Sequence, residues 1–249
     1  MTAFQALVLA GSRGGVDPVA VYAGVTHKAL IILGGQTLLA RVVGALTAAG
    51  AVRIAVTSSH PDVRAEAVRL GAEVLDEAAG PSLSVAAGVQ VLGTPLLVTT
   101  ADHALLKPAW VRQFLADVPA GVDVAALVAA RATVEAAAPR TKRTWLKFAD
   151  GDWSGCNLFW LASDRALGVV DLWRRVEAER KRPWRMARIL GPGMLLRYLS
   201  GRLTLADAAR RLGRLAGVTA AIVQTPFGLA SVDVDKPADL DLVRQIVGK

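Results

Sequence analysis

Cysteine is almost absent from this chain of 249 residues, because Cys156 is the only one. A single thiol excludes an intramolecular disulfide and any zinc site built from several cysteines, and it favours a reducing compartment. We expect Cys156 to be a small buried hydrophobe rather than a nucleophile. The scarcity of cysteine therefore predicts a cytoplasmic protein whose fold depends on its apolar core.

Long uninterrupted hydrophobic runs are also missing, although 53% of the residues are hydrophobic. Charge, glycine or proline interrupts every apolar run before it reaches the about 20 residues that a membrane-spanning helix needs. The first five residues, Met-Thr-Ala-Phe-Gln, lack the basic and apolar regions of a secretory signal. We therefore expect no transmembrane helix and no export.

Acidic residues are scarce in one segment. Residues 165–214 hold 13 lysines and arginines against 4 acidic residues, a net charge of +9, whereas the whole chain carries +8. Such a segment fits an anionic acceptor, peripheral contact with an anionic membrane, or a solvated basic face. Trp173, Trp184 and Tyr198 are spaced as helix-packing residues rather than as a base-stacking platform, so we expect no nucleic acid partner.

Strand and helix patterns alternate along most of the chain, which is typical of a mainly parallel sheet with ligand sites at the carboxyl ends of its strands. Two further short runs, at 144–148 and 156–161, predict an antiparallel excursion and hence a mixed sheet. Strand patterns return at 218–224 and 231–234, and a closing helix is predicted at 237–247. With no repeat and no linker, we expect an α/β fold, Rossmann-like, with one domain over 1–249 and a basic helical insertion at about 163–217.

A glycine-rich turn, Gly11–Gly15, follows the first predicted strand at residues 4–10. Glycine lets backbone N–H groups approach phosphate oxygens closely, although an ordinary turn would look the same. The turn matches neither a dinucleotide fingerprint nor a P-loop, since no Gly-Lys-Ser/Thr closes it. Arg13 and Lys28 add the positive charge that a triphosphate needs.

Carboxylates occupy the ends of two predicted strands. Asp102 follows the apolar run at 95–100, where burial is costly without a cation. Asp233 and Asp235 flank Val234, so an extended segment would place both on one face. Mg²⁺ takes one or two carboxylates, and Asp102 with Asp235 would suffice, although Asp233 is an alternative second ligand. Asp235 could instead cap the helix that begins near Pro237.

These motifs together resemble the nucleotidyltransferases of the molybdenum-cofactor type, the MobA-like NTP transferases. The resemblance rests on the order of four segments and covers residues 4–130 and 218–247. The segments are Leu9-Ala10-Gly11-Ser12-Arg13-Gly14, Lys28 ahead of Leu33-Gly34-Gly35-Gln36-Thr37-Leu38-Leu39, Thr100-Ala101-Asp102, and Asp233-Val234-Asp235-Lys236-Pro237-Ala238-Asp239-Leu240. It implies a GT-A-type, three-layer α/β/α sandwich.

The resemblance also implies the roles of individual residues. Arg13, Lys28 and Asp102 match the catalytic positions, and Asp102 and Asp235 match the Mg²⁺ ligands. Asn157, within Gly155-Cys156-Asn157-Leu158-Phe159, matches a position near the acceptor. The residues expected to bind the nucleotide are Leu9, Ala10, Gly11, Ser12, Arg13, Gly14, Lys28, Ser82, Ser84 and Asp102. The stretch between Gly15 and His27 departs from the family loop in length and character.

The resulting hypothesis is transfer of a nucleoside monophosphate from an NTP to a small phosphorylated acceptor, such as a sugar or polyol phosphate, with release of pyrophosphate. CTP is preferred over UTP and GTP because Ser82–Val85 resembles cytidylyltransferases. An ionised phosphate is already a nucleophile, so catalysis needs positioning and charge neutralisation rather than a side-chain base. A GT-A glycosyltransferase is the alternative enzyme, although Thr100-Ala101-Asp102 lacks the first aspartate of an Asp-x-Asp motif. A nucleotide-binding protein without catalysis is the other alternative, and the sequence specifies no oligomeric state.

Overall fold

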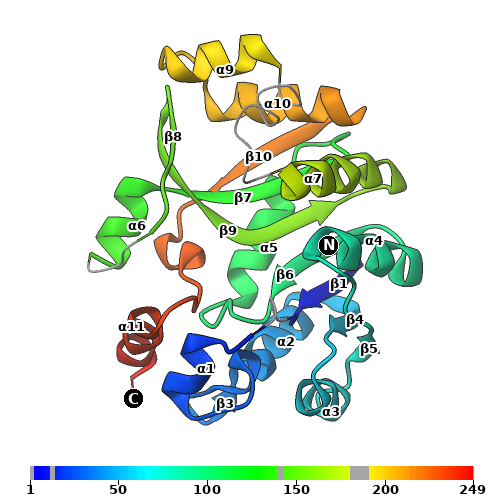
Figure 1. The fold of residues 1–249 in the computed structure, drawn as a ribbon, viewed down its shortest axis with the longest axis vertical. Helices are drawn as coiled ribbons and strands as arrows, with labels where there is room; N and C mark the ends of the chain where they lie inside the picture. Colours follow the sequence, from blue (N-terminus) through cyan, green and yellow to red (C-terminus); the bar gives the residue numbers. More distant parts are fainter. Residues whose placement is uncertain (1–2, 12–14, 140–142, 180–190, 249) are drawn as a thin grey trace.

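The computed structural model describes residues 3–11, 15–139, 143–179 and 191–248. Its described strands form one eight-stranded sheet and a small two-stranded hairpin, β2 (Ile32–Leu33) with β3 (Gln36–Thr37). Figure 1 shows the large sheet running through the molecule with helices on both sides. In spatial order its strands are β10 (Ala220–Thr225), β7 (Val124–Ala130), β9 (Gly151–Leu161), β6 (Leu96–Thr100), β1 (Phe4–Leu9), β4 (Ala51–Thr57) and β5 (Glu73–Leu75), and β8 (Leu146–Phe148) pairs with β9.

The sheet is mixed and mainly parallel, as the sequence predicts. β1 pairs in parallel with both β4 and β6, β4 pairs in parallel with β5, and β7 pairs in parallel with β10. β9 lies antiparallel between β6 and β7, and β8 lies antiparallel to β9. The predicted antiparallel excursion therefore runs through the middle of the sheet, where it separates the two parallel groups.

Two apolar clusters, one on each face of the sheet, make this a three-layer α/β/α sandwich. Alternation along β1 sends Phe4, Ala6 and Val8 into one cluster and Leu7 into the other. The first cluster takes residues from α2 (Leu38–Ala49), α3 (Pro61–Arg69), α5 (Pro108–Asp117), α6 (Arg131–Ala137) and α11 (Pro237–Val247). The second takes residues from α4 (Pro81–Leu92) and α7 (Leu167–Glu179).

Local capping signals fix the helix that follows the first loop. Thr37 begins α2, because its Oγ1 accepts a hydrogen bond from the backbone N of Ala40 at 2.9 Å. Gly50 ends it with φ of 106°, a left-handed conformation that glycine adopts without steric cost. The sequence predicts the second of these ends, since Gly50 follows the last residues of the apolar period; the threonine cap was not predicted.

The predicted insertion contains α7, α9 (Pro192–Leu199) and α10 (Leu205–Ala216), with residues 180–190, including Trp184, outside the described part. Figure 1 places α9 and α10 at the end of the molecule opposite α11 and the C-terminus. The β8–β9 hairpin tip holds them: Asp150 Oδ1 accepts a hydrogen bond from the backbone N of Leu205 at 2.9 Å, and the rings of Phe148 and Tyr198 meet edge to face at 5.9 Å. Since β10 then re-enters the sheet, we propose that residues 1–249 form a single domain.

One predicted strand is wrong. Residues 231–234 are not a strand, because the 3₁₀ turn η3 (Gly228–Ser231) leads into backbone that pairs with no neighbouring strand among the described residues. The backbone N of Val234 donates instead to the carbonyl of Asp102 at 3.1 Å. Helices α1 (Pro18–Ala23), α5 and α6 were not predicted at all. No helix in the described ranges is long and apolar enough to cross a membrane.

Two helical glycines provide a test of how tightly α10 belongs to the core. A Cβ added to Gly213 in α10 would lie 2.8 Å from the carbonyl oxygen of Val218, whereas one added to Gly44 in α2 would meet nothing within 4 Å. We expect Gly213→Ala to lower the free energy of unfolding by about 1–3 kcal/mol through overpacking. We expect Gly44→Ala to raise it by about 0.5–1 kcal/mol through helix propensity.

Urea denaturation with linear extrapolation measures both changes. Equal, stabilising effects of the two substitutions would show that α10 does not pack on β10 as described.

Candidate active site

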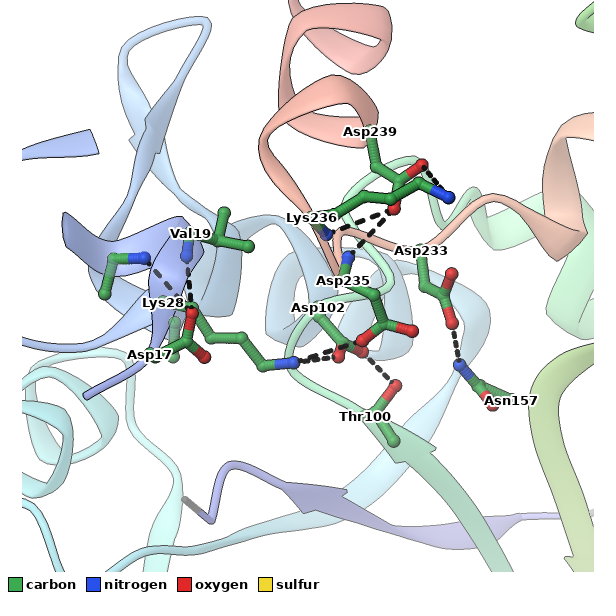
Figure 2. Close-up of polar contacts among 12 residues, drawn as sticks. Asp17, Val19, Lys28, Thr100, Asp102, Asn157, Asp233, Asp235, Lys236 and Asp239 are labelled. Atoms are coloured by element: carbon green, nitrogen blue, oxygen red, sulfur yellow. Dashed lines mark hydrogen bonds and ion pairs between the residues drawn. The ribbon is translucent and has the colours of Figure 1, made fainter. Parts of the chain in front are cut away.

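Three of the predicted site residues, Lys28, Asp102 and Asp235, lie together where β1 and β6 end side by side. Leu9 and Thr100 are the last residues of these strands and are register partners. Lys28 begins the 3₁₀ turn η1 (Lys28–Leu30), and the backbone bond from Val234 to Asp102 brings the C-terminal segment to the same edge. Figure 2 shows side chains from these segments pointing toward one another.

Asp102 is a buried carboxylate with two partners. The residue is 7% exposed. Its Oδ2 lies 2.5 Å from Lys28 Nζ, and its Oδ1 accepts a hydrogen bond from Thr100 Oγ1, also at 2.5 Å. Burying an ionised carboxylate is costly unless it is paired and hydrogen-bonded, so these contacts explain how Asp102 remains at the end of an apolar strand.

Lys28 is the cation shared by two carboxylates. Its Nζ lies 3.5 Å from Asp235 Oδ1 in addition to the contact with Asp102. Burial opposes its charge, yet the ion pair with Asp102, reinforced by Asp235, raises the pKa of Lys28 above its ordinary value. The turn that presents it is capped by His27, whose Nδ1 accepts a hydrogen bond from the backbone N of Ala29 at 3.1 Å.

Asp235 lies among more negative charge than Lys28 balances. Enclosure and the charges of Asp233 and Asp102 raise the pKa of Asp235, and Lys28 works against this rise. Because 62% of the side chain is exposed, solvent screens these effects. Asp235 does not cap α11: Asp239 Oδ2 accepts from the backbone N of Asp235 at 3.3 Å and of Lys236 at 3.2 Å.

Asp233 belongs to a separate network. It is 8% exposed, its Oδ1 lies 2.5 Å from Arg143 Nη2, and its Oδ2 accepts a hydrogen bond from Asn157 Nδ2 at 2.8 Å. Figure 2 shows Asp233 pointing toward Asn157 while Asp235 points toward Lys28. The two carboxylates that the sequence expected on one face thus have different partners.

Asn157 reaches Asp233 because the strand that carries it is distorted. The register between β7 and β9 shifts between Ala126 and Val128, opposite this residue. Asn157 has φ of 49°, a left-handed conformation that asparagine tolerates better than most residues. Such a bulge re-aims a side chain, here toward the C-terminal segment.

The sequence profile of the MobA-like NTP transferase domain matches residues 6–183. This chain belongs to the MobA-like NTP transferase family. A solved structure described as a hypothetical transferase from Thermus thermophilus shares 33% identity, with 96% of this chain and 100% of that chain covered and a TM-score of 0.83. None of the curated proteins matches.

Two more distant structures share the family's fold. A nucleotidyl transferase from Methanothermobacter thermautotroptrophicus has 20% identity, a TM-score of 0.57 and coverage of 99% of this chain and 98% of that one. A CMP:2-keto-3-deoxy-manno-octonic acid synthetase complexed with CTP has 16% identity, a TM-score of 0.56 and coverage of 98% of each chain. The predicted GT-A-type fold is therefore confirmed.

The residues present suit the divalent cation that nucleotidyltransferases of this family typically use. Asp102 and Asp235 offer carboxylate oxygens, the ligands that Mg²⁺ prefers. Three carboxylates, Asp102, Asp233 and Asp235, face two cations, Lys28 and Arg143, so a negative charge is left over. Within the described residues no three His, Cys, Asp or Glu side chains form a preassembled metal cage.

The expected nucleotide-binding residues of the MobA-like family fall into three groups. Leu9 ends β1, and Ala10 and Gly11 follow it. Backbone hydrogen bonds fix the first two, from Ala101 N to Leu9 O and from Ala10 N to Thr57 O, both 3.0 Å. Ser12, Arg13 and Gly14 lie outside the described residues. Ser82 and Ser84 are buried in the first turn of α4. Ser84 Oγ accepts a hydrogen bond from the backbone N of Ala78 at 3.1 Å, so it shapes the loop before α4.

Two residues at the site were missed by sequence reasoning. Arg143 lies just before β8 in a short basic stretch, and the charge of that stretch was the available signal. Glu77 lies two residues beyond β5, the same position relative to a strand end that singled out Asp102. The carboxylate of Glu77 packs against Gly11, so a Cβ added to Gly11 would overlap Glu77 Oε1. The same carboxylate accepts a hydrogen bond from Ser59 Oγ at 2.8 Å.

Two potential nucleophiles or bases are inactive for physical reasons. Cys156 is 1% exposed, and burial raises the pKa of its thiol to about 12, as expected for a core residue. His103 is also buried, and burial lowers its pKa to about 4, so the imidazole is neutral at pH 7. Its ring lies 6.4 Å from that of Trp110, in the apolar layer beneath the site.

The left-handed conformation of Asn157 leads to a prediction about stability. Asn157→Ala and Asn157→Gly both remove the amide that donates to buried Asp233, which should lower the free energy of unfolding by about 1–3 kcal/mol. Alanine must also adopt positive φ, so we expect the alanine variant to be less stable than the glycine variant by about 1 kcal/mol.

Chemical denaturation of the two variants isolates the backbone contribution, because neither has the amide. An alanine variant as stable as the glycine variant would contradict the conformation described for residue 157.

Proposed function

We propose that this chain transfers a nucleoside monophosphate from an NTP to a small phosphorylated acceptor, such as a sugar or polyol phosphate, and releases pyrophosphate. The observation that supports it most is Lys28 held between Asp102 and Asp235 where β1 and β6 end. In an open α/β sheet this edge is where ligands bind. Family membership favours nucleotidyl transfer over the glycosyltransferase alternative.

The NTP would lie on the loop that follows β1. We assign the contacts to backbone and side chains of Leu9, Ala10, Gly11, Ser12, Arg13 and Gly14, with Ser82 and Ser84 supporting the loop near the base. Arg13 and Lys28 would neutralise the triphosphate. CTP is our first choice of nucleotide, since Ser82–Val85 resembles cytidylyltransferases and one structure with this fold was solved with CTP.

Asp102 and Asp235 would hold Mg²⁺. When bound, the ion neutralises phosphate charge and favours departure of pyrophosphate. Lys28 already lies between the two carboxylates, so it keeps them close together and can turn toward phosphate oxygens when the NTP enters. Asp102 would move least when Mg²⁺ binds, because the hydrogen bond from Thr100 fixes its other carboxylate oxygen, Oδ1.

The acceptor would bind on the side of Asn157 and Arg143, with Asp233 orienting both. An acceptor phosphate oxygen attacks the α-phosphorus, the new P–O bond forms, and the bond to the β-phosphate bridging oxygen breaks in line. The attacking oxygen is ionised at pH 7, so no proton has to be removed. This agrees with a site in which His103 is neutral and buried and Cys156 is protonated.

The first test is pyrophosphate release from each of the four NTPs with Mg²⁺ against a panel of sugar, polyol and amino-alcohol phosphates. We expect one NTP and one acceptor to support turnover. Asp102→Ala should lower kcat/KM by about 10²–10³-fold or more, because it removes charge that acts on the transferring phosphate. Asp117→Ala, at the exposed last residue of α5, is the matched control and should leave turnover unchanged.

Calorimetry separates two kinds of negative result in this experiment. Binding of an NTP without turnover would point to an acceptor outside the panel. Failure to bind any of the four NTPs with Mg²⁺ would overturn the proposal.

A second test separates the two carboxylates of the C-terminal segment. Asp235→Asn should raise the Mg²⁺ concentration for half-maximal rate about tenfold or more and leave the acceptor KM unchanged, since it removes a ligand charge. Asp233→Asn should raise the acceptor KM and leave the Mg²⁺ concentration for half-maximal rate unchanged, because it loosens Arg143 and Asn157. Titrations of Mg²⁺ and of acceptor for both variants measure the difference. A larger Mg²⁺ effect in Asp233→Asn than in Asp235→Asn would reverse the assignment.

A further inference from the structure

Helix α9 presents an apolar stripe to solvent. Leu195, Leu196 and Leu199 are 39%, 69% and 72% exposed, and none of the eight residues of α9 is buried. Spacings of three and four residues place these leucines on one side of the helix. Large apolar side chains grouped on an exposed helix face mark an interaction site more often than single exposed ones do.

The opposite side of α9 makes the contacts that attach it to the protein. Arg197 Nη2 lies 2.8 Å from Asp207 Oδ2 of α10, and the ring of Tyr198 meets that of Phe148. The side of α9 that carries Met194, Arg197 and Tyr198 therefore faces its own chain, while the leucines face outward. A helix that turns three leucines to solvent can meet an apolar partner with that side.

Positive charge surrounds this helix. A cavity of about 250 Å³ between α9 and α10 is lined by Gly193, Met194, Arg197, Leu203, Asp207, Arg211 and Arg214. Asp207 is its one acidic side chain and already contacts Arg197 and Arg210. Arg211 and Arg214 are exposed and make no ion pair within the described residues. Two exposed guanidinium groups in one groove suit phosphate oxygens, which arginine binds well.

The leucines and arginines together favour an anionic bilayer as the partner. A helix with exposed leucines beside clustered arginines has the character of helices that lie in the interface of an anionic bilayer. A second copy of the chain is a poorer fit, because eight residues span about 12 Å and three leucines fall far short of the about 800 Å² per partner of a stable interface. Nucleic acid would use the arginines but would leave the leucines in water.

We propose that α9 and the arginine groove between α9 and α10 dock on an anionic phospholipid surface. The leucines of α9 enter the boundary between headgroups and acyl chains, and Arg211 and Arg214 bind lipid phosphates. The protein lies on the bilayer rather than across it. This inference does not depend on the proposed nucleotidyl transfer.

The test is sedimentation of the whole protein with vesicles of phosphatidylcholine alone or with 30% phosphatidylglycerol. We expect binding only to the anionic vesicles, and weaker binding as salt rises. Leu196→Ser/Leu199→Ser should weaken it at least about tenfold. Arg211→Gln/Arg214→Gln should weaken it about 25-fold, or about fivefold for each arginine.

Matched controls change two exposed valines and two partly exposed arginines elsewhere in the chain. Val52→Ser/Val68→Ser and Arg112→Gln/Arg244→Gln should bind like the unchanged protein. Thermal melts and NTP binding confirm that each variant is folded, and they do so whatever the membrane result.

Three outcomes would overturn the proposal. One is no sedimentation with anionic vesicles at low salt. Another is binding that survives the double leucine substitution, which would mean that α9 does not insert. The third is displacement of the protein from vesicles by inorganic phosphate or by duplex DNA at matched ionic strength, which would assign the groove to a free anion or to nucleic acid.

Discussion

The ion pair between Lys28 and Asp102 is the contact on which the candidate site depends. A carboxylate that is 7% exposed at the end of an apolar strand is tolerable only with a cation beside it. Asp102 also receives the backbone N–H of Val234 at its carbonyl oxygen. Its side chain thus fixes the lysine turn after β1, and its backbone fixes the C-terminal segment, so three distant parts of the chain meet at one residue.

A second buried pair, Arg143 with Asp233, divides the site into two halves with different electrostatics. On one side Asp233 is neutralised by a guanidinium and by the amide of Asn157. On the other, Asp102 and Asp235 share one lysine and keep surplus negative charge. In the proposed function, the negative half would hold the cation of the nucleotide and the neutralised half would face the acceptor phosphate.

Sequence reasoning predicted the sheet and its open edge well because those depend on local patterns, such as the apolar run before Asp102 and the glycine that ends α2. It failed where backbone bonds go to a distant partner, as for residues 231–234, which bond to the turn after β6. It also missed Arg143, since the charge of an arginine says nothing about which carboxylate it meets. The backbone twist at Asn157 has no signature in the sequence either.

The long strand β9 has a mechanical consequence. Its start, beside Asp150, touches the beginning of α10, and seven residues later Asn157 touches Asp233, a span of about 23 Å for extended backbone. β9 pairs with β8 at 151–153 and with β7 at 153–155, and the bulge at Asn157 follows, so a displacement at the start of β9 is passed along this paired stretch or absorbed by the bulge. Any free-energy coupling carried this way is reciprocal: a ligand bound at the outer helices would alter ligand affinity beside Asn157 by the same factor as a ligand beside Asn157 alters affinity at the outer helices.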